Sequence, residues 1–216
     1  MNTDSRPTTA MPRHQTSSPR PQRTVARRRW RVAALSVALL SITAWTPAAH
    51  AAVETEANEA AVQAAFVFNF ARFTEWPPSA FGSKTSPLNH CLFGPREALA
   101  HALNSLSERP VQGRPLHFIQ MERLDELKNC HLVFMAEPDV KRRAQALQAL
   151  AGQPTLTVSD IEGFAREGGM IGLIRVGTRL RFEINRIQSQ KAGLRLAADL
   201  LNLATSIVDS DMGVNR

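Results

Sequence analysis

Residues 131–159 read HLVFMAEPDVKRRAQALQALAGQPTLTVS, and this stretch decides the fold. The apolar run at 131–136 predicts a buried strand. Asp139 then caps a helix that runs through Leu150, and residues 155–158 form the next strand. Strands that alternate with helices in this way indicate a parallel sheet covered by helices.

The same alternation extends toward the N-terminus. An apolar run at 88–94, which ends in Gly-Pro, predicts another buried strand, and leucines in helical register predict a helix over 96–106. Residues 116–121 alternate as a strand, and residues 124–128 form a short helical turn. We therefore expect an α/β domain with a mostly parallel sheet and helices on both faces.

The pattern changes toward the C-terminus. Residues 170–176 and 180–184 flank a Gly177-Thr178 turn, which predicts an antiparallel hairpin at one edge of the sheet. From Arg186 onward, two neighbouring apolar stripes predict one long C-terminal helix with a wide buried face.

An aromatic-rich helix is predicted over Glu54–Phe73, and it ends before Pro77 because proline disfavours a helical conformation at the residue before it. Apolar residues at helical spacing form one stripe, which we expect to face the core. Core packing explains these aromatics better than a binding box does. The stripe consists of Val62, Phe66, Phe70 and Phe73.

Residues 27–51 have the three parts of a secretory signal: a run of arginines, an apolar segment and an Ala-x-Ala site that places cleavage between Ala51 and Ala52. The apolar segment is shorter than the ~20 residues that span a bilayer. An uncut signal anchor is the alternative. We expect residues 1–51 to be a signal peptide with a disordered N-terminal extension, and residues 52–216 to be one exported, periplasmic domain.

The net charge belongs to the leader. Eight Arg and one Asp up to Ala51 account for the whole formal charge of +7, so residues 52–216 are formally neutral. A nucleic-acid partner for the exported domain therefore loses its main support.

Both cysteines, Cys91 and Cys130, lie in the exported part. An even pair in an oxidising compartment predicts one disulfide. The neighbouring His90 and His131 would complete a four-ligand zinc site as the alternative. Neighbours on a strand face opposite sides, so cysteines that face each other would leave these histidines facing away. We predict the disulfide and no metal.

The sequence contains no recognisable catalytic or cofactor motif. The chain has no phosphate loop, no dinucleotide-binding glycine pattern and no nucleophile elbow. Asp160 could act as a base, but a cap for a helical turn over 161–165 explains it better. Gly168 and Gly169 fit a tight backbone bend. The sequence therefore predicts no catalytic residue and no cofactor, and favours an interaction or ligand-binding domain.

Several phrases in a fixed order resemble the YfiR-like periplasmic family, over about residues 58–205. Each phrase is weak alone, and the ordered set is specific. The phrases are residues 62–77 (VQAAFVFNFARFTEWP), 111–116 (VQGRPL), 130–134 (CHLVF), 157–160 (TVSD), 163–164 (GF), 168–172 (GGMIG), 181–185 (RFEIN) and 194–196 (LRL).

The resemblance implies a periplasmic repressor that binds the periplasmic region of an inner-membrane diguanylate cyclase. Repression lowers cyclic di-GMP and biofilm formation, and an outer-membrane lipoprotein can sequester the repressor. Members form homodimers. The best-known members carry two disulfides, and Cys91 and Cys130 match one of those pairs.

Two surfaces are candidates for function. A repressor needs an exposed, partly apolar contact patch, for which we name Phe68, Trp76 and Phe81 on and near the opening helix. The alternative function is a small-ligand sensor module that feeds a histidine kinase or cyclase. Its pocket would be lined by Asp160, Phe164, Gly168 and Gly169. A weaker third possibility is an exported hydrolase that uses Asp160.

Overall fold

The computed structural model describes residues 47–209, with side chains described from Glu54. Within this range, residues 50–209 belong to one compact unit. The predicted leader lies outside the described residues up to position 46. Ala51 and Ala52 lie within the first helix, α2 (Pro47–Arg72), and cleavage between them stays a prediction.

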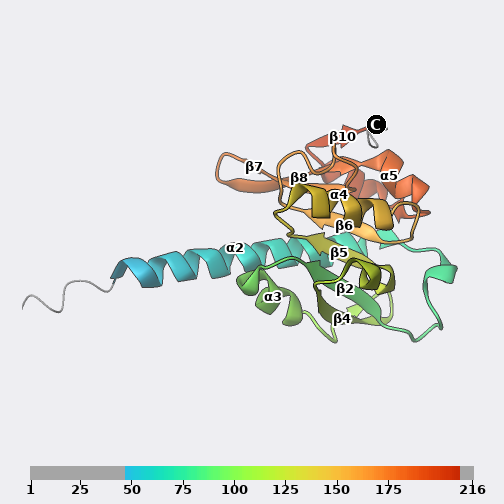
Figure 1. Cartoon of the computed structure of the whole chain (residues 1–216), viewed down its shortest axis with the longest axis horizontal. Coiled ribbons are helices and arrows are strands. Elements are labelled where there is room, and N and C mark those ends of the chain that lie inside the picture. Colours follow the sequence, from blue (N-terminus) through green and yellow to red (C-terminus); the bar gives the residue numbers. More distant parts are fainter. Residues whose placement is uncertain (1–46, 210–216) are drawn as a thin grey trace, which may run out of the picture. The chain divides into compact units, whose positions relative to one another are not determined.

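An eight-stranded sheet forms the centre of the domain (Figure 1). All neighbouring pairs are parallel except two: the β7–β8 hairpin and β3–β4. The mostly parallel sheet and the antiparallel hairpin are confirmed, but β10 pairs with β8, so the hairpin lies one strand inside the edge. In spatial order the strands are β10 (Ser206–Val208), β8 (Arg179–Asn185), β7 (Ile171–Val176), β6 (Leu156–Ser159), β5 (Leu132–Met135), β2 (Leu88–Phe93), β4 (Arg114–Met121) and β3 (Pro110–Val111).

The chain winds in both directions from β2. It passes through α3 (Glu97–Asn104) to β4 on one side, then through the 3-10 helix η2 (Leu124–Asn129) to β5 on the other. It continues through α4 (Val140–Ala149) to β6. The strand order thus reverses between β2 and β5, and the carboxyl ends of β2, β5 and β6 share one edge, where α/β proteins commonly bind ligands.

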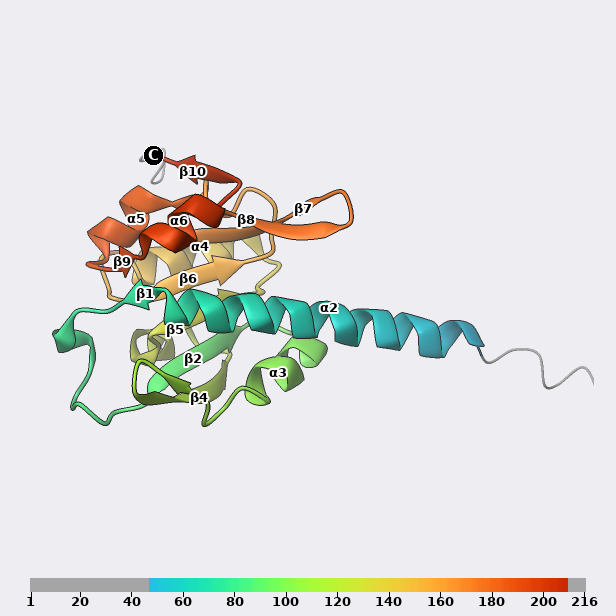
Figure 2. The same ribbon diagram turned by 180° about the vertical axis from the view of Figure 1, so that it is seen from behind.

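Helices cover both faces of this sheet, as predicted. Alternate side chains of β2 and β5 pack on opposite sides. Figure 2 shows α2 and α3 over one face, with α4 behind the sheet. Leu88, Leu92, Leu132 and Phe134 pack with α2 and α3, whereas Cys91, Phe93, Val133 and Met135 pack with α4 and η2.

The buried stripe of α2 differs from the predicted one. Val62 is 47 % exposed, and Phe66 and Phe73 are only partly buried. Phe70 is the one member of the predicted stripe that is fully buried, and its ring meets that of Phe182 at 5.1 Å. α2 turns several small side chains toward the sheet, and these allow the helix to approach the sheet closely. The buried positions are Ala60, Gln63, Ala64, Val67, Phe70 and Ala71.

The prediction of one long C-terminal helix is wrong. Two short helices, α5 (Arg186–Lys191) and α6 (Ala198–Leu203), are separated by β9 (Arg195–Leu196). Gly193, with a φ of +71°, follows the end of α5. The strand β9 then pairs with β1 (Thr74–Glu75), which follows α2. Long-range pairing therefore interrupts an apolar pattern that would otherwise suit a continuous helix.

No helix in the range 47–209 combines the length and the apolar character needed to cross a membrane.

Candidate functional site

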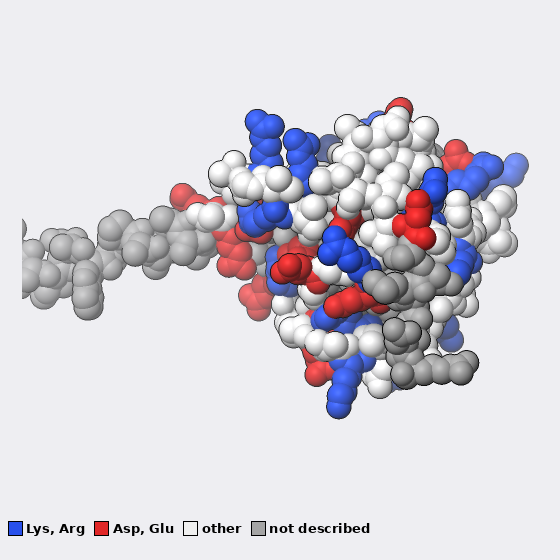
Figure 3. Space-filling view, turned by 90° about the horizontal axis from the view of Figure 1, so that it is seen from above, with Lys and Arg blue, Asp and Glu red and all other residues white. Residues whose placement is uncertain are grey.

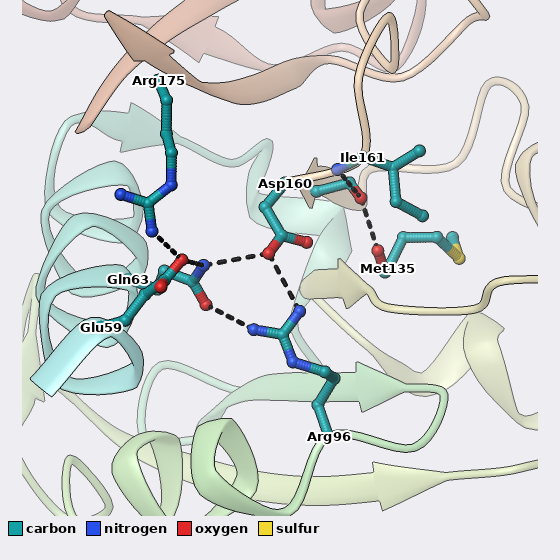
Figure 4. A network of polar contacts seen from close by, with 8 residues as sticks. Glu59, Gln63, Arg96, Met135, Asp160, Ile161 and Arg175 are labelled. Carbon is teal, nitrogen blue, oxygen red and sulfur yellow. Dashed lines mark hydrogen bonds and ion pairs between the residues drawn. The ribbon is translucent and has the colours of Figure 1, made fainter. Parts of the chain in front are cut away.

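A network of polar side chains lies where β6 ends (Figure 4). Arg96 Nη1 donates to Asp160 Oδ2 at 2.9 Å, and Gln63 Nε2 donates to the same oxygen at 3.0 Å. Arg96 Nη2 also donates to Gln63 Oε1 at 3.1 Å. The three side chains therefore close a triangle of hydrogen bonds, of which one is an ion pair.

Topology brings these residues together. Arg96 follows β2 and Asp160 follows β6, so both lie at the carboxyl edge of the sheet, and Gln63 comes from α2. Gln63 is 1 % exposed, and both its oxygen and its nitrogen have partners, as a buried amide requires. Neither Gln63 nor Arg96 was predicted from the sequence to be a site residue. Arg96 could have been recognised by its charge. Arg96 and Asp160 carry opposite charges, and each comes shortly after a predicted parallel strand.

Asp160 is not the helix cap that the sequence suggested, because residues 161–165 form turns and no helix. The neighbouring Ser159 stabilises this turn. Its hydroxyl accepts a hydrogen bond from the Ile161 N–H at 3.1 Å and donates one to the Met135 carbonyl at 2.6 Å. The Asp160 carboxylate is thereby free to face α2.

A cavity of about 460 Å³ adjoins the network, between α2, the turn after β6 and the hairpin. Its arginines are paired with carboxylates: Arg175 with Glu59, and Arg166 with Glu183 at 3.3 Å. Seen from above, acidic and basic side chains lie next to one another rather than in separate patches (Figure 3). The lining consists of Glu59, Gln63, Asp160, Glu162, Gly163, Arg166, Leu173, Ile174, Arg175, Leu180 and Glu183.

Of the four residues predicted to line a ligand pocket, this cavity includes Asp160 alone. Phe164 is fully buried in the core on the α4 face. A Cβ at Gly169 would lie 2.1 Å from the Phe164 ring, so Gly169 is required by packing, and Gly168 has a φ of +104°. The predicted tight bend is correct, whereas Phe164, Gly168 and Gly169 do not line this cavity.

Backbone atoms fill the space between the carboxyl ends of β2 and β5. Gly94 has a φ of +112°, and a Cβ there would lie 2.6 Å from backbone atoms of Ala136 and Glu137. The segments that follow β2 and β5 therefore touch directly. The cavity lies beside this contact, next to β6 and β7.

The three predicted contact residues differ in exposure. Trp76 is only 9 % exposed, so its assignment to an unburied flank is wrong: it packs in the core and its Nε1 donates to the His131 carbonyl at 3.1 Å. Phe68 and Phe81 are half-buried. Phe81 stacks on the His131 ring at 4.5 Å.

Phe68 lines a second, mostly apolar groove of about 290 Å³ between α2 and the end of α3. The guanidinium of Arg109 lies 5.1 Å from its ring centre, and that of Arg72 lies 6.0 Å away. Arginines over an aromatic face are attracted by its quadrupole. Among the described residues, no carboxylate is ion-paired with either arginine.

Cys91 and Cys130 are joined in a disulfide, with their Cα atoms 6.0 Å apart. The bond is buried and links β2 to the start of β5 on the α4 face. His90 and His131 lie away from it: His90 Nε2 contacts the Leu103 carbonyl at 3.1 Å, and burial lowers the pKa of His90 to about 4. The two histidines therefore lie apart from the two cysteines, and the four side chains do not converge on one point as zinc ligands would. Within residues 47–209, no group of three or more His, Cys, Asp or Glu is arranged to hold a metal.

The sequence matches the YfiR/HmsC-like family model over residues 60–205. The chain belongs to the YfiR/HmsC-like family. The match begins within α2 and ends after α6, so it covers almost the whole described domain. The resemblance drawn from the short sequence phrases is therefore confirmed.

Two solved structures overlap with this YfiR/HmsC-like chain. The first is an ABC domain in complex with L-Trp from Streptococcus pneumoniae, at 7% identity and a TM-score of 0.45, covering 67% of this chain and 60% of that one. The second is a conserved domain protein from Vibrio cholerae, at 14% identity and a TM-score of 0.37, covering 57% and 55%. The chain thus spans less than two thirds of either protein. At these values neither structure bears on what this chain binds.

Proposed function

We propose that this YfiR/HmsC-like protein is a periplasmic regulator that binds the periplasmic region of an inner-membrane diguanylate cyclase and represses it. Repression would lower cyclic di-GMP and reduce biofilm formation. The observation that carries this proposal is the family match over residues 60–205. The protein acts through binding, without chemistry of its own.

The disulfide supports an exported location, because such bonds persist in oxidising compartments. In the periplasm the domain is separated from cytoplasmic GTP, from which cyclic di-GMP is made. An effect on this second messenger must therefore pass through a membrane protein. A homodimer and an outer-membrane lipoprotein that sequesters it belong to the same proposal.

We assign the cyclase-binding surface to the groove around Phe68. Phe68 is half-buried on α2, the groove beside it is mainly apolar, and two arginines flank the ring. Aromatic and arginine side chains dominate binding energies at protein interfaces. Phe81, which stacks on His131 outside this groove, is a second candidate contact residue, whereas the buried Trp76 contributes through the core.

The test uses cells that lack this gene and carry a cyclic di-GMP reporter. Complementation with the wild-type gene should restore a low reporter signal. When the gene of the repressed cyclase is deleted as well, the signal should be low with or without complementation, because there is then no enzyme to repress. The tagged protein should co-purify with the cyclase from solubilised membranes. An unchanged signal in the deletion strain, together with no co-purification, would contradict the proposal.

The second candidate is a sensor for a small polar ligand, which would signal through a histidine kinase or a cyclase. The 460 Å³ cavity supports it, because the partly exposed Asp160 carboxylate lines it and can accept a hydrogen bond there. A panel of small polar metabolites should then raise the melting temperature of wild-type protein and not that of Asp160→Asn. If no compound shifts the wild-type protein, this candidate is excluded.

A further inference from the structure

The histidine beside the disulfide holds a surface segment in place. His131 Nδ1 accepts a hydrogen bond from the Asn89 backbone N–H at 3.0 Å, and His131 Nε2 lies 3.0 Å from the Ala80 carbonyl oxygen. A backbone N–H can only donate and a carbonyl can only accept. The ring is therefore neutral, with its proton on Nε2.

Residues 77–87, which include the 3-10 helix η1 (Pro78–Ala80), connect β1 to β2 and are here called the latch segment. His131 contacts it through the Ala80 carbonyl and through its stack on Phe81, whose ring is tilted by only 14°. The Arg114 guanidinium lies 3.7 Å from the Phe81 ring centre.

Arg114 makes a second attachment. Its Nη1 donates to the carbonyls of Ser83 and Ser86, each at 2.8 Å. The latch segment itself is mostly exposed and has three backbone hydrogen bonds of its own. Two side chains from the sheet, His131 and Arg114, thus provide much of what holds it.

We propose that His131 is an acid-sensitive latch: protonation of its Nδ1 releases residues 77–87 from the sheet. The new proton would point at the Asn89 N–H, so an acceptor becomes a second donor and the hydrogen bond is lost. The imidazolium would also bring a second positive charge close to the Arg114 guanidinium, which already contacts the Phe81 ring. The protonated ring is therefore repelled by the Asn89 N–H and by Arg114, and it must leave the position from which it holds Ala80 and Phe81.

The charges around His131 favour release of the latch segment at acid pH. Burial lowers the pKa of His131, the hydrogen bond to Ala80 raises it, and the Arg114 charge lowers it further. Asn89 and Asn129 are neutral, and Lys84 is an exposed cation on the latch segment. Within residues 54–209 no carboxylate is bonded to His131 or Arg114 to compensate a new charge.

The lowered pKa of His131 determines whether the latch weakens in acid or in base. A released His131 has an ordinary pKa of about 6.5 and binds a proton more readily than the latched one. The latch is therefore at full strength above about pH 6.5, and it weakens as the pH falls through the lowered pKa. Any link from the latch to cyclase repression rests on the proposed function, but the latch itself does not.

The test is hydrogen exchange of the full exported chain at about pH 7.5 and about pH 5.5, corrected for the intrinsic pH dependence of exchange. The Asn89 amide and the latch segment should exchange several-fold faster at the lower pH. His131→Phe keeps a ring against Phe81 and removes the titrating group, so its exchange should not depend on pH. His117→Phe, at an exposed histidine on the neighbouring strand β4, is the matched control and should keep the wild-type response.

A second measurement covers the case in which His131→Phe does not fold. Nitrogen chemical shifts of the imidazole rings in the wild-type protein report tautomer and protonation directly. His131 should carry its proton on Nε2 at about pH 7.5, and its titration should coincide with faster exchange at Asn89. Equal exchange at both pH values, or a pH response that survives in His131→Phe, would overturn the proposal.

Discussion

Arg96 and Asp160 form an ion pair at 2.9 Å across the carboxyl edge of the sheet, although 64 residues separate them in sequence. Each follows a parallel strand, and β5 lies between those two strands. Gln63 of α2 bonds to both and is buried. The pair therefore fastens the opening helix to the edge where the cavity lies.

Removing the carboxylate should loosen this attachment. In Asp160→Ala, the buried Gln63 Nε2 and the Arg96 guanidinium lose their shared acceptor. We expect a loss of about 1–2 kcal/mol in the free energy of unfolding, at the low end for charged groups because the Arg96 and Asp160 side chains are partly exposed. Urea denaturation measures it. Asp125→Ala, which removes an exposed ion pair with Arg123, is the control and should leave the free energy of unfolding nearly unchanged.

The disulfide should be present and stabilising. Non-reducing peptide mass spectrometry of the exported protein should detect a linked Cys91–Cys130 peptide. The bond closes a loop with a sequence separation of 39, and its removal in Cys91→Ala/Cys130→Ala should cost about 2–4 kcal/mol of unfolding free energy. Free thiols at both positions in exported protein would show the pairing to be wrong.

Gly169 should not tolerate a side chain. A Cβ there would overlap the Phe164 ring, which is fully buried and cannot move aside. Gly169→Ala should destabilise the domain by about 1–3 kcal/mol, the usual range for overpacking. Gly82→Ala is the matched control, because its Cβ meets only the Ser86 hydroxyl at 3.7 Å. Equal melting temperatures for the two variants would refute this packing role.

Substitutions at Phe68 and Trp76 should distinguish a loss of function from a loss of stability. Phe68→Ala should raise cyclic di-GMP in a reporter strain and weaken co-purification with the cyclase, because it removes the aromatic part of the groove. Its melting temperature should fall only modestly, since the ring is half-buried. Trp76→Ala should instead lower the melting temperature strongly, because that ring is in the core. Normal repression by folded Phe68→Ala would rule out this surface.

Acid should destabilise the domain through His90. Burial lowers its pKa to about 4. The unfolded chain, with a histidine pKa of about 6.5, binds the proton first, so this contribution to stability is complete above about pH 6.5 and falls as the pH drops toward 4. Its full size is about 3 kcal/mol, from 1.36 kcal/mol for each pH unit. Urea denaturation of His90→Gln between about pH 7 and 4 should show a shallower decline than wild type.

Local patterns were enough to predict most of the sheet. Short, largely apolar runs indicated β2, β5 and β6. The Asp139 side chain caps α4 by accepting the Arg142 N–H at 2.7 Å, as its position before the helix suggested. The hairpin followed from a turn between two apolar segments. Each of these elements depends on signals within a few residues, which a sequence carries directly.

The candidate site was predicted only in part. Asp160 was singled out, but its partners Gln63 and Arg96 come from α2 and from the end of β2, and strand order alone brings them together. Phe164 and Gly169 were expected to line a pocket and instead pack against each other. A side chain's distance from a cavity depends on every element around it, which no local pattern contains.

The sequence by itself determined the α/β class, the family and the two cysteines available for a disulfide. Only the tertiary structure decided that β9 pairs with β1 and divides the C-terminal helix, that α2 turns its small residues toward the sheet, and that Trp76 is buried. Helical periodicity allows more than one face of α2 to be buried. The choice between faces, and between a continuous helix and an interrupted one, rests on contacts with segments that are distant in sequence.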